Sequence, residues 1–266
     1  MQTRLVILGG GQMGEALLTG LVAGGGVQLE ELGVVEPRPE RREELIAAHP
    51  GLRVMETPVT AEGVVVAVKP VDAEAACRSL RGLEVTRVLS IAAGVPLAVL
   101  EGWLEPGVRV LRAMSNTPAL VGAAVSALAP GTQAHEGDLG WAEAVLGAVG
   151  TVVRLPEASL DAVTGLSGSG PAYLFLIVEA LVDAGVAVGL SHDVSQTLVT
   201  QTVAGAARLL TESGASPATL RAAVTSPGGT SAAGLGVLEG RAVRGALLDA
   251  VSAATARSVE LGHPGP

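Results

Sequence analysis

Short apolar runs without polar alternation recur through the first half of the chain, as expected for strands of a parallel sheet that is covered on both faces. The predicted strands are residues 5–8, 33–36, 64–68, 87–90 and 108–111, with 121–129 and 151–155 completing the sheet. Helical patterns lie between them at 12–24, 39–48, 72–80, 97–102 and 135–148. The alternation predicts an α/β fold with a doubly wound, mostly parallel sheet.

After Pro156 the pattern changes, because only helical periodicity follows. The predicted helices are residues 159–166, 171–189, 192–213, 216–224, 231–239 and 241–262. We therefore expect a first domain at 1–156 and an all-helical second domain at 157–266. Its helices are too apolar for a small domain standing alone, which predicts burial against another copy of the chain. The alternative is that they pack only on the first domain.

Composition narrows the possible functions of a chain of 266 residues with 48% hydrophobic content. A net charge of −9 and an aromatic content of 2% argue against a nucleic-acid partner. Cys77 is the only cysteine, which excludes an internal disulfide. The histidines, at 49, 135, 192 and 263, lack metal-ligand spacing and are expected on the surface or in loops, so no metal site is predicted.

The apolar stretch Pro171–Leu190 is the one segment that raises the question of a membrane. Glu179 and Asp183 lie in its middle, where carboxylates are costly in lipid. We therefore predict a helix buried in a helical interface and no membrane partner. The start of the chain does not resemble a secretory signal, so a cytoplasmic location is expected.

The first predicted strand runs directly into Gly9-Gly10-Gly11-Gln12-Met13-Gly14, a G-x-G-x-x-G motif that opens a helix. In a Rossmann-type domain such glycines let the backbone approach a pyrophosphate, and the helix N-terminus offers free N–H groups. We predict a dinucleotide site at Gly9, Gly11, Gln12, Met13 and Gly14. The alternative is a glycine-rich turn without a ligand.

Glu36 closes the second predicted strand, where a carboxylate can accept hydrogen bonds from the ribose 2′-OH of NAD. Arg38 follows, with Arg41 and Arg42, and these side chains could instead hold the 2′-phosphate of NADP. A solvated helix face explains the arginines equally well. The choice between NAD and NADP therefore stays open.

Two further strand ends are expected to reach the cofactor. Ala67-Val68-Lys69-Pro70 ends one strand, and Lys69 is the single lysine beside 16 arginines. A lysine at the carboxyl edge of a parallel sheet lies where ligands bind in such folds. Ala92-Ala93-Gly94 follows another strand, and its small residues would let a nicotinamide ring lie close, although a well-packed strand end explains them too.

Several segments together resemble the pyrroline-5-carboxylate reductase family, in the family's order and over residues 4–260. Besides the glycine motif and Ala67–Pro70, they are Arg112–Leu120, Asp161–Tyr173 and Val224–Ser231, the last with the diagnostic Ser-Pro-Gly-Gly-Thr. Two positions depart from the family's usual residues: Ser231 replaces a second threonine, and Ser115 stands where proline is frequent.

The resemblance implies hydride transfer from NADPH or NADH, with NADPH slightly favoured, to the C=N carbon of 1-pyrroline-5-carboxylate, giving L-proline. It adds Asn116, Thr117 and Pro118 to the expected cofactor contacts, and it implies a homodimer or larger homo-oligomer formed through the C-terminal helices.

The Gly-Gly-Thr-Ser segment carries the expected substrate site. Gly228, Gly229, Thr230 and Ser231 precede or begin a predicted helix, whose amides and hydroxyls would bind the substrate carboxylate. Ser231, with Thr230 beside it, is the candidate for contacting or protonating the ring nitrogen. The alternative is that Ser226 or Thr230 merely caps the helix.

Two other functions fit part of the sequence. A β-hydroxyacid dehydrogenase shares the domain layout but needs a lysine on its long helix, and no lysine follows Lys69. A dinucleotide-binding sensor without turnover would keep the glycine motif but would not need the anion site near Ser231. Glu179, on the apolar helix, is expected to be a buried structural partner in preference to a site residue.

Overall fold

The computed structural model describes residues 3–25 and 27–262, which divide into two compact units. One unit comprises the chain up to Ser169 together with the residues from Ser252 onward, and the other comprises Gly170–Val251. The expected domain boundary after residue 156 falls earlier than this division. The residues that follow position 156 stay with the first unit because Leu160 is buried in one of the cores that pack on the sheet.

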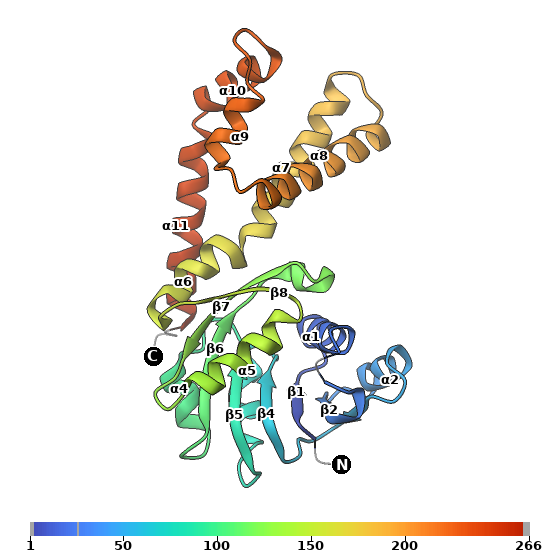
Figure 1. Ribbon diagram of the computed structural model, residues 1–266, viewed down its shortest axis with the longest axis vertical. Helices are drawn as coiled ribbons and strands as arrows, with labels where there is room; N and C mark the ends of the chain where they lie inside the picture. The colour runs from blue at the N-terminus through green and yellow to red at the C-terminus, as the bar shows by residue number, and fades with distance from the viewer. Residues whose placement is uncertain (1–2, 26, 263–266) are drawn as a thin grey trace. The chain divides into compact units, whose positions relative to one another are not determined.

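The first unit is built on one eight-stranded sheet in the order β3-β2-β1-β4-β5-β6-β7-β8 (Figure 1). Strands β1 to β6 are parallel, and β7 runs antiparallel to β6 but parallel to β8. The strands are β1 (Leu5–Leu8), β2 (Leu32–Val35), β3 (Arg53–Met55), β4 (Ala61–Val66), β5 (Val85–Ser90), β6 (Arg109–Met114), β7 (Ala124–Pro130) and β8 (Gly150–Arg154).

The strand order reverses direction at β1, which lies between β2 and β4. Leu8 pairs with Val35 on one side and with Val66 on the other, so three strands end side by side at this edge. Ligands of open α/β sheets bind at such a switch point, outside the carboxyl ends of the strands. The glycine motif follows β1 directly and is therefore placed at this edge.

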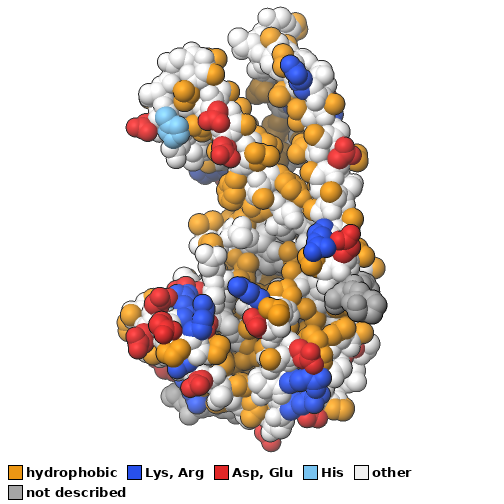
Figure 2. Space-filling model, turned by 180° about the vertical axis from the view of Figure 1, so that it is seen from behind, with side chains coloured by type: hydrophobic (Ala, Val, Ile, Leu, Met, Phe, Trp, Pro, Cys, Tyr) orange, Lys and Arg blue, Asp and Glu red, His pale blue; other side chains and the backbone are white. Residues whose placement is uncertain are grey.

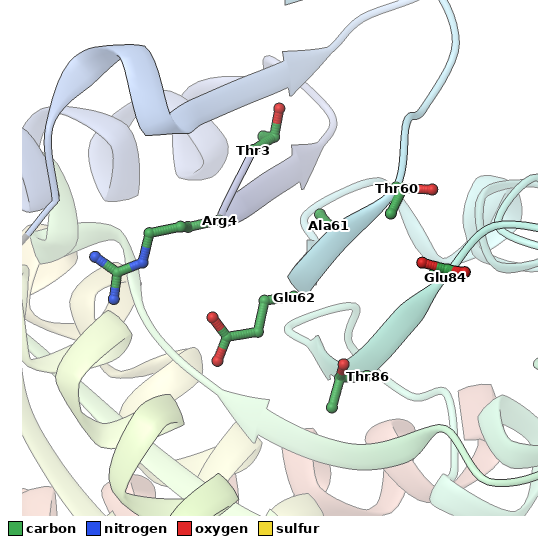
Figure 3. Close-up of a pocket in the computed structure, with 7 residues that line it drawn as sticks. All are labelled: Thr3, Arg4, Thr60, Ala61, Glu62, Glu84 and Thr86. Carbon is green, nitrogen blue, oxygen red and sulfur yellow. The ribbon is translucent and has the colours of Figure 1, made fainter. Parts of the chain in front are cut away.

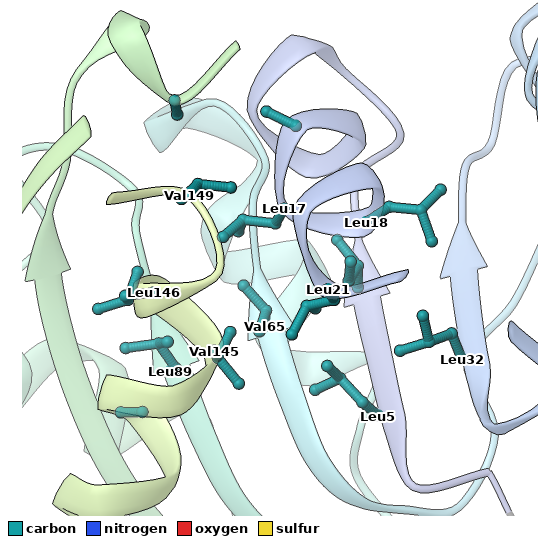
Figure 4. Close-up of a cluster of buried hydrophobic side chains, with 14 of the residues drawn as sticks. Leu5, Leu17, Leu18, Leu21, Leu32, Val65, Leu89, Val145, Leu146 and Val149 are labelled. Carbon is teal, nitrogen blue, oxygen red and sulfur yellow. The ribbon is translucent and has the colours of Figure 1, made fainter. Parts of the chain in front are cut away.

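Alternate side chains of each central strand enter two separate cores. Leu5 and Ile7 face one core, which α1 (Gln12–Ala23), α2 (Pro39–Ala48) and α5 (Glu136–Gly147) cover (Figure 4). Val6 and Leu8 face the other, which α3 (Ala73–Arg78), α4 (Leu97–Trp103) and α6 (Leu160–Val163) cover. Burial on both faces explains why these strands lack polar alternation.

Three local features differ from the sequence-based prediction. Strand β3 was not predicted, because its three residues are too few for a recognisable period and Arg53 is exposed. The predicted strand 121–129 begins later, since a 3-10 helix, η3 (Thr117–Val121), precedes β7. The predicted helix 159–166 is α6 followed by a π-helical turn, η5 (Thr164–Gly168).

The second unit contains α7 (Gly170–Ala187), α8 (His192–Ser213), α9 (Pro217–Ala223) and α10 (Thr230–Gly240), and α11 (Val243–Gly262) runs from it into the first unit. Ser191 and Ser216 cap α8 and α9 by accepting first-turn amides with their hydroxyls. Helices α7 and α8 approach closely at Gly185, where an added Cβ would lie 2.5 Å from the Ser195 Oγ.

Most apolar side chains of the second unit are exposed in the single chain. In α7 only Val182 is buried, while Phe175 and Leu176 are 67% and 66% exposed. Figure 2 shows apolar side chains spread over these helices with few charged ones among them. The expected burial of Glu179 is wrong for the single chain, because its side chain is exposed.

By length and composition alone, Glu157–Ala187 is the one described stretch that could cross a membrane.

Candidate active site

The loop after β1 turns tightly against its neighbours. Gly9 has a φ of +104°, and a Cβ atom there would lie 2.7 Å from the carbonyl oxygen of Ala67. The Gly9 amide donates to the carbonyl oxygen of Val35 over 2.8 Å. A Cβ on Gly14 would lie 2.0 Å from the carbonyl oxygen of Gly9. The fold itself therefore requires glycine at both positions.

Gly11 differs from these glycines, because nothing lies within 4 Å of a Cβ built on it. Its φ of −73° and ψ of −176° are extended values that any residue can adopt. Gly11 is the N-cap of α1, and no side chain caps that helix. The first-turn amides are thus left to an outside acceptor, and the open space beside them fits a pyrophosphate.

A cavity of about 580 Å³ opens at the carboxyl edge of the sheet beside this loop. This volume is within the range of small-molecule sites. Seven predicted cofactor residues line it: Gly9, Gly11, Glu36, Arg38, Ala67, Val68 and Lys69. Gln12, Met13, Gly14 and Pro70 do not line it, although Gln12 and Pro70 are adjacent in sequence to residues that do.

Sequence reasoning missed part of the cavity wall. Glu56, Thr57 and Pro58 line it because they follow β3, whose carboxyl end lies next to that of β2. Because β3 was not predicted from the sequence, these three residues were not expected at the carboxyl edge of the sheet. The α3 side contributes further lining residues, which are Asp72, Ala75, Ala76 and Ser79. The turn-forming Thr57-Pro58 after a short apolar run was the available signal.

Two smaller cavities lie elsewhere on the first unit. One of about 230 Å³ is lined by Thr3, Arg4, Thr60, Ala61, Glu62, Glu84 and Thr86, at the amino ends of β1, β4 and β5 (Figure 3). It is at the opposite edge from the one where ligands of such sheets bind. The other, of about 430 Å³, lies between α1 and η3. Neither contains a residue predicted to bind the cofactor.

Glu36 is the first residue after β2, and its side chain is only 4% exposed. Its Oε2 accepts the Gly10 amide over 3.2 Å, and its Oε1 accepts the Arg38 Nε over 2.8 Å. Burial alone would raise the pKa of Glu36, but the bonds and charge of Arg38, with the Gly10 amide, together lower it. The cavity therefore presents an ionised carboxylate.

The three arginines near Glu36 have different tasks. Arg38 is 64% exposed and pairs with the Glu36 carboxylate. Arg41 donates from Nε to the carbonyl oxygen of Gly10 over 2.7 Å. Arg42 donates to the carbonyl oxygens of Glu36 and Pro37 over 2.9 and 2.8 Å. The solvated helix face considered for these arginines is therefore wrong for Arg41 and Arg42, which hold the loops in place.

Lys69 is exposed at the end of the turn that follows β4, and no ion pair of residues 3–25 and 27–262 includes it. Its place in the cavity wall is the one the sequence indicated. A free ammonium there can meet an anionic ligand.

The remaining predicted cofactor residues do not line the 580 Å³ cavity. In the loop after β5, Ala92 is buried, Ala93 is exposed, and Gly94 has a φ of +74°. The Asn116 side chain is committed to the fold: its Nδ2 donates to the Ser167 carbonyl over 3.1 Å, and its Oδ1 accepts the Val125 amide over 3.0 Å. Thr117 and Pro118 begin η3. Contact of these six residues with a cofactor stays a prediction.

The predicted substrate segment lies at the start of α10. Gly228 has a φ of +69°, Gly229 is the N-cap, and Thr230 and Ser231 are exposed in the first turn. No side chain caps α10, so the alternative that Ser226 or Thr230 serves only as a cap is wrong. The first-turn amides and two hydroxyls are free to meet an anion.

The described residues contain no group of three or more His, Cys, Asp or Glu side chains that could hold a metal ion. His49 is half-buried, with its Nε2 3.4 Å from the Glu15 carboxylate, and His135 is the N-cap residue before α5. His263 lies outside the described residues. Burial raises the pKa of the Cys77 thiol to about 11, which makes it a poor nucleophile.

Two sequence models of protein families match the chain. Residues 157–261 match the model described as pyrroline-5-carboxylate reductase dimerisation. Residues 4–94 match the model described as NADP oxidoreductase coenzyme F420-dependent. The first covers nearly all of the helical half, and the second covers the glycine loop, Glu36 and Lys69.

Individual proteins resemble the chain along its whole length. A pyrroline-5-carboxylate reductase of Synechocystis sp. is 43% identical over 98% of this chain and 99% of its own. The structure of a pyrroline-5-carboxylate reductase from Coxiella burnetii has a TM-score of 0.90 at 33% identity, covering 98% of this chain and 99% of that one. A Plasmodium falciparum pyrroline carboxylate reductase, crystallised with NADP bound, has a TM-score of 0.85 at 29% identity, covering 98% of both chains.

Proposed function

Because the chain belongs to the pyrroline-5-carboxylate reductase family, we propose how its own residues divide the work of that reaction. The protein is an NAD(P)H-dependent oxidoreductase that reduces 1-pyrroline-5-carboxylate to proline. When bound, the reduced nicotinamide would supply a hydride to the C=N carbon, so the C=N bond of the substrate becomes the CH–NH group of proline. The protein's contribution is to bind, align and supply a proton.

The first unit holds the dinucleotide. Gly11 leaves room for the pyrophosphate, which would accept hydrogen bonds from the first-turn amides of α1. Glu36 and Arg38 face the adenosine ribose, and Lys69 adds a positive charge on the other side of the glycine loop. Ala92–Gly94 and Asn116–Pro118 are proposed to border the nicotinamide end, where the backbone and small side chains allow close approach.

The start of α10 holds the substrate. The amides of Gly229, Thr230 and Ser231 would bind the carboxylate, favoured by the positive end of the helix dipole. A protonated imine accepts a hydride more readily than a neutral one. The Ser231 hydroxyl, with Thr230 beside it, is proposed to donate a hydrogen bond to the ring nitrogen, which gains a proton as the C=N bond is reduced.

The second unit assembles homo-oligomers, as the dimerisation model that matches it describes. We propose that the covering partner is a second copy of the chain seated on the apolar faces of α7 and α8, where Phe175 and Leu176 are exposed. A homodimer, or a larger homo-oligomer built from dimers, would bring a dinucleotide site and a substrate segment together.

We also propose that the apolar helix does not enter a membrane and that the enzyme acts in the cytoplasm. Glu179 and Asp183 lie one turn apart in the middle of α7, where two carboxylates oppose insertion into lipid. The dimerisation model matches residues 157–261, which include this helix, and this supports a partner subunit as the surface that covers it.

The observation that carries the proposed assignment is that α1 and α10 each follow a glycine N-cap and that no side chain caps either helix, which leaves their first-turn amides for an anion. Mixing purified protein with 1-pyrroline-5-carboxylate and NADH or NADPH, and following nicotinamide absorbance, tests turnover. Oxidation of the cofactor with formation of proline supports the proposal. Dinucleotide binding without turnover favours a sensor, and turnover of a β-hydroxyacid in its place favours that dehydrogenase family.

A further inference from the structure

One end of the dinucleotide cavity is acidic. Glu36 and Glu56 both line it beside the carboxyl ends of β2 and β3. Of the three arginines that could neutralise a phosphate there, Arg38 alone contributes to the lining. Arg41 is held by Gly10 and Glu15, while Arg42 donates to backbone carbonyls and lies 3.9 Å from the Glu56 carboxylate, outside the cavity lining. An additional phosphate at this end would thus find one arginine and two carboxylates.

The charge of Arg38 is already used by Glu36. Its Nε donates to Oε1 over 2.8 Å, its Nη2 donates to Oε2 over 3.2 Å, and its amide donates to Oε1 over 3.1 Å. This bidentate arrangement is the strong form of a carboxylate–guanidinium pair. If Arg38 turned toward a phosphate, a buried carboxylate would lose its main partner.

Glu36 lies against the glycine loop. A Cβ atom built on Gly10 would lie 3.3 Å from both the Cβ and the Oε2 of Glu36, so the carboxylate rests directly on the glycine loop. The Gly10 amide donates to the same Oε2 over 3.2 Å. Lys69 cannot substitute for Arg38 here, because it follows β4, which lies on the other side of β1 from β2.

We propose that Glu36 makes this reductase selective for NADH over NADPH by presenting a fixed carboxylate to the 2′ position of the adenosine ribose. The proposal rests on the dinucleotide site proposed above. A 2′-hydroxyl donates a hydrogen bond to the carboxylate, whereas a 2′-phosphate is repelled by it. The NADP bound to the Plasmodium protein is a property of that protein and of its own residues.

Calorimetric titration of the purified full-length protein with NADH and with NADPH tests the proposal without requiring turnover. We expect the wild-type protein to bind NADH at least about tenfold more tightly, the effect of one like-charge contact. Equal affinities, or tighter binding of NADPH, would overturn the proposal. The comparison of the two affinities in the wild-type protein is sufficient to test the selectivity, so the test does not depend on whether a variant folds.

Glu36→Gln is the matched variant, since it keeps the shape of the side chain and removes its charge. The ratio of the two dissociation constants should move toward NADPH by about tenfold, while Glu56→Gln, at the exposed wall, should change it much less. An unchanged ratio in a folded Glu36→Gln protein would contradict the role of Glu36. The ratio of kcat/KM values should follow the same order. If NADH binds more tightly than NADPH but no pyrroline-5-carboxylate is reduced, the result contradicts the proposed reaction and still supports the proposed selectivity for NADH.

Discussion

Gly14 lies so close to Gly9 that a Cβ atom on Gly14 would be 2.0 Å from the Gly9 carbonyl oxygen. The contact joins the first turn of α1 to the end of β1 and fixes the direction in which the helix leaves the sheet. Two glycines of the same motif therefore have a structural task, while Gly11, with no neighbour near its Cβ position, is left for the ligand.

Gly14→Ala should unfold the first unit more easily. The clash is with backbone, which cannot rotate away, so we expect a loss of about 3 kcal/mol in the free energy of unfolding. Urea denaturation followed by circular dichroism measures it. Gly137→Ala, in α5 where nothing lies near an added Cβ, is the matched control and should lose nothing. A Gly14→Ala protein as stable as wild type would contradict the close contact.

Gly11→Val should leave stability nearly unchanged and strongly weaken dinucleotide binding. The extended backbone accepts valine, but the new side chain enters the space expected for the pyrophosphate. Affinity should fall by about 100-fold or more, equivalent to about 2.8 kcal/mol. Calorimetry with NADH and thermal unfolding of the same preparation separate the two effects. Retained affinity would place the pyrophosphate elsewhere.

Ser231→Ala should lower kcat by about 100-fold while the dissociation constant of NADH stays within twofold of wild type (about 0.4 kcal/mol). The hydroxyl is exposed at the start of α10 and is expected to meet substrate and not cofactor. Ser231→Thr keeps a hydroxyl and should retain most activity. Full activity of Ser231→Ala would remove its proposed role, although the family membership is unaffected.

Leu176→Glu should convert the homo-oligomer to smaller species. Leu176 is exposed on α7 among other apolar side chains, and a carboxylate there would be buried without a partner on assembly. Size-exclusion chromatography with light scattering reads the mass directly. Ile46→Glu, an exposed apolar position on α2, controls for the added charge. An active wild-type monomer would contradict the proposed assembly.

Asp138→Asn should destabilise the protein at neutral pH by about 2–4 kcal/mol. The carboxylate lies 2.8 Å from the Arg109 Nε and 3.7 Å from the Arg87 Nη1. Burial would raise the pKa of Asp138, but the His135 amide, Arg109 and Arg87 together lower it. Arg87 also stacks on Trp141, 4.9 Å from the ring centroid.

Because the pKa of Asp138 is lower in the folded than in the unfolded chain, its stabilisation is complete above the ordinary value of about 3.9 and is lost as the pH falls further. The stabilities of wild type and Asp138→Asn should therefore differ at about pH 7, and the difference should shrink as the pH falls below about 3.9. A difference that persists unchanged at the lower pH would show that packing and not charge causes the effect.

The sequence by itself determined the mostly parallel sheet, the all-helical second half, and the family. The short apolar run at 64–68, between Gly63 and Pro70, indicates a strand that is buried on both faces, and the glycine spacing at residues 9–14 after a strand indicates a dinucleotide loop. Local patterns carry this information because each depends on residues that are neighbours in the chain.

Only the tertiary structure decided which residues share the cavity and which side chains are already engaged. Strand β3 brings Glu56 beside Glu36, and Arg38, one of three similar arginines in the sequence, is the one that lines the wall. These relationships depend on strand order and on competition between hydrogen-bond partners far apart in the chain, which no period or spacing along it records.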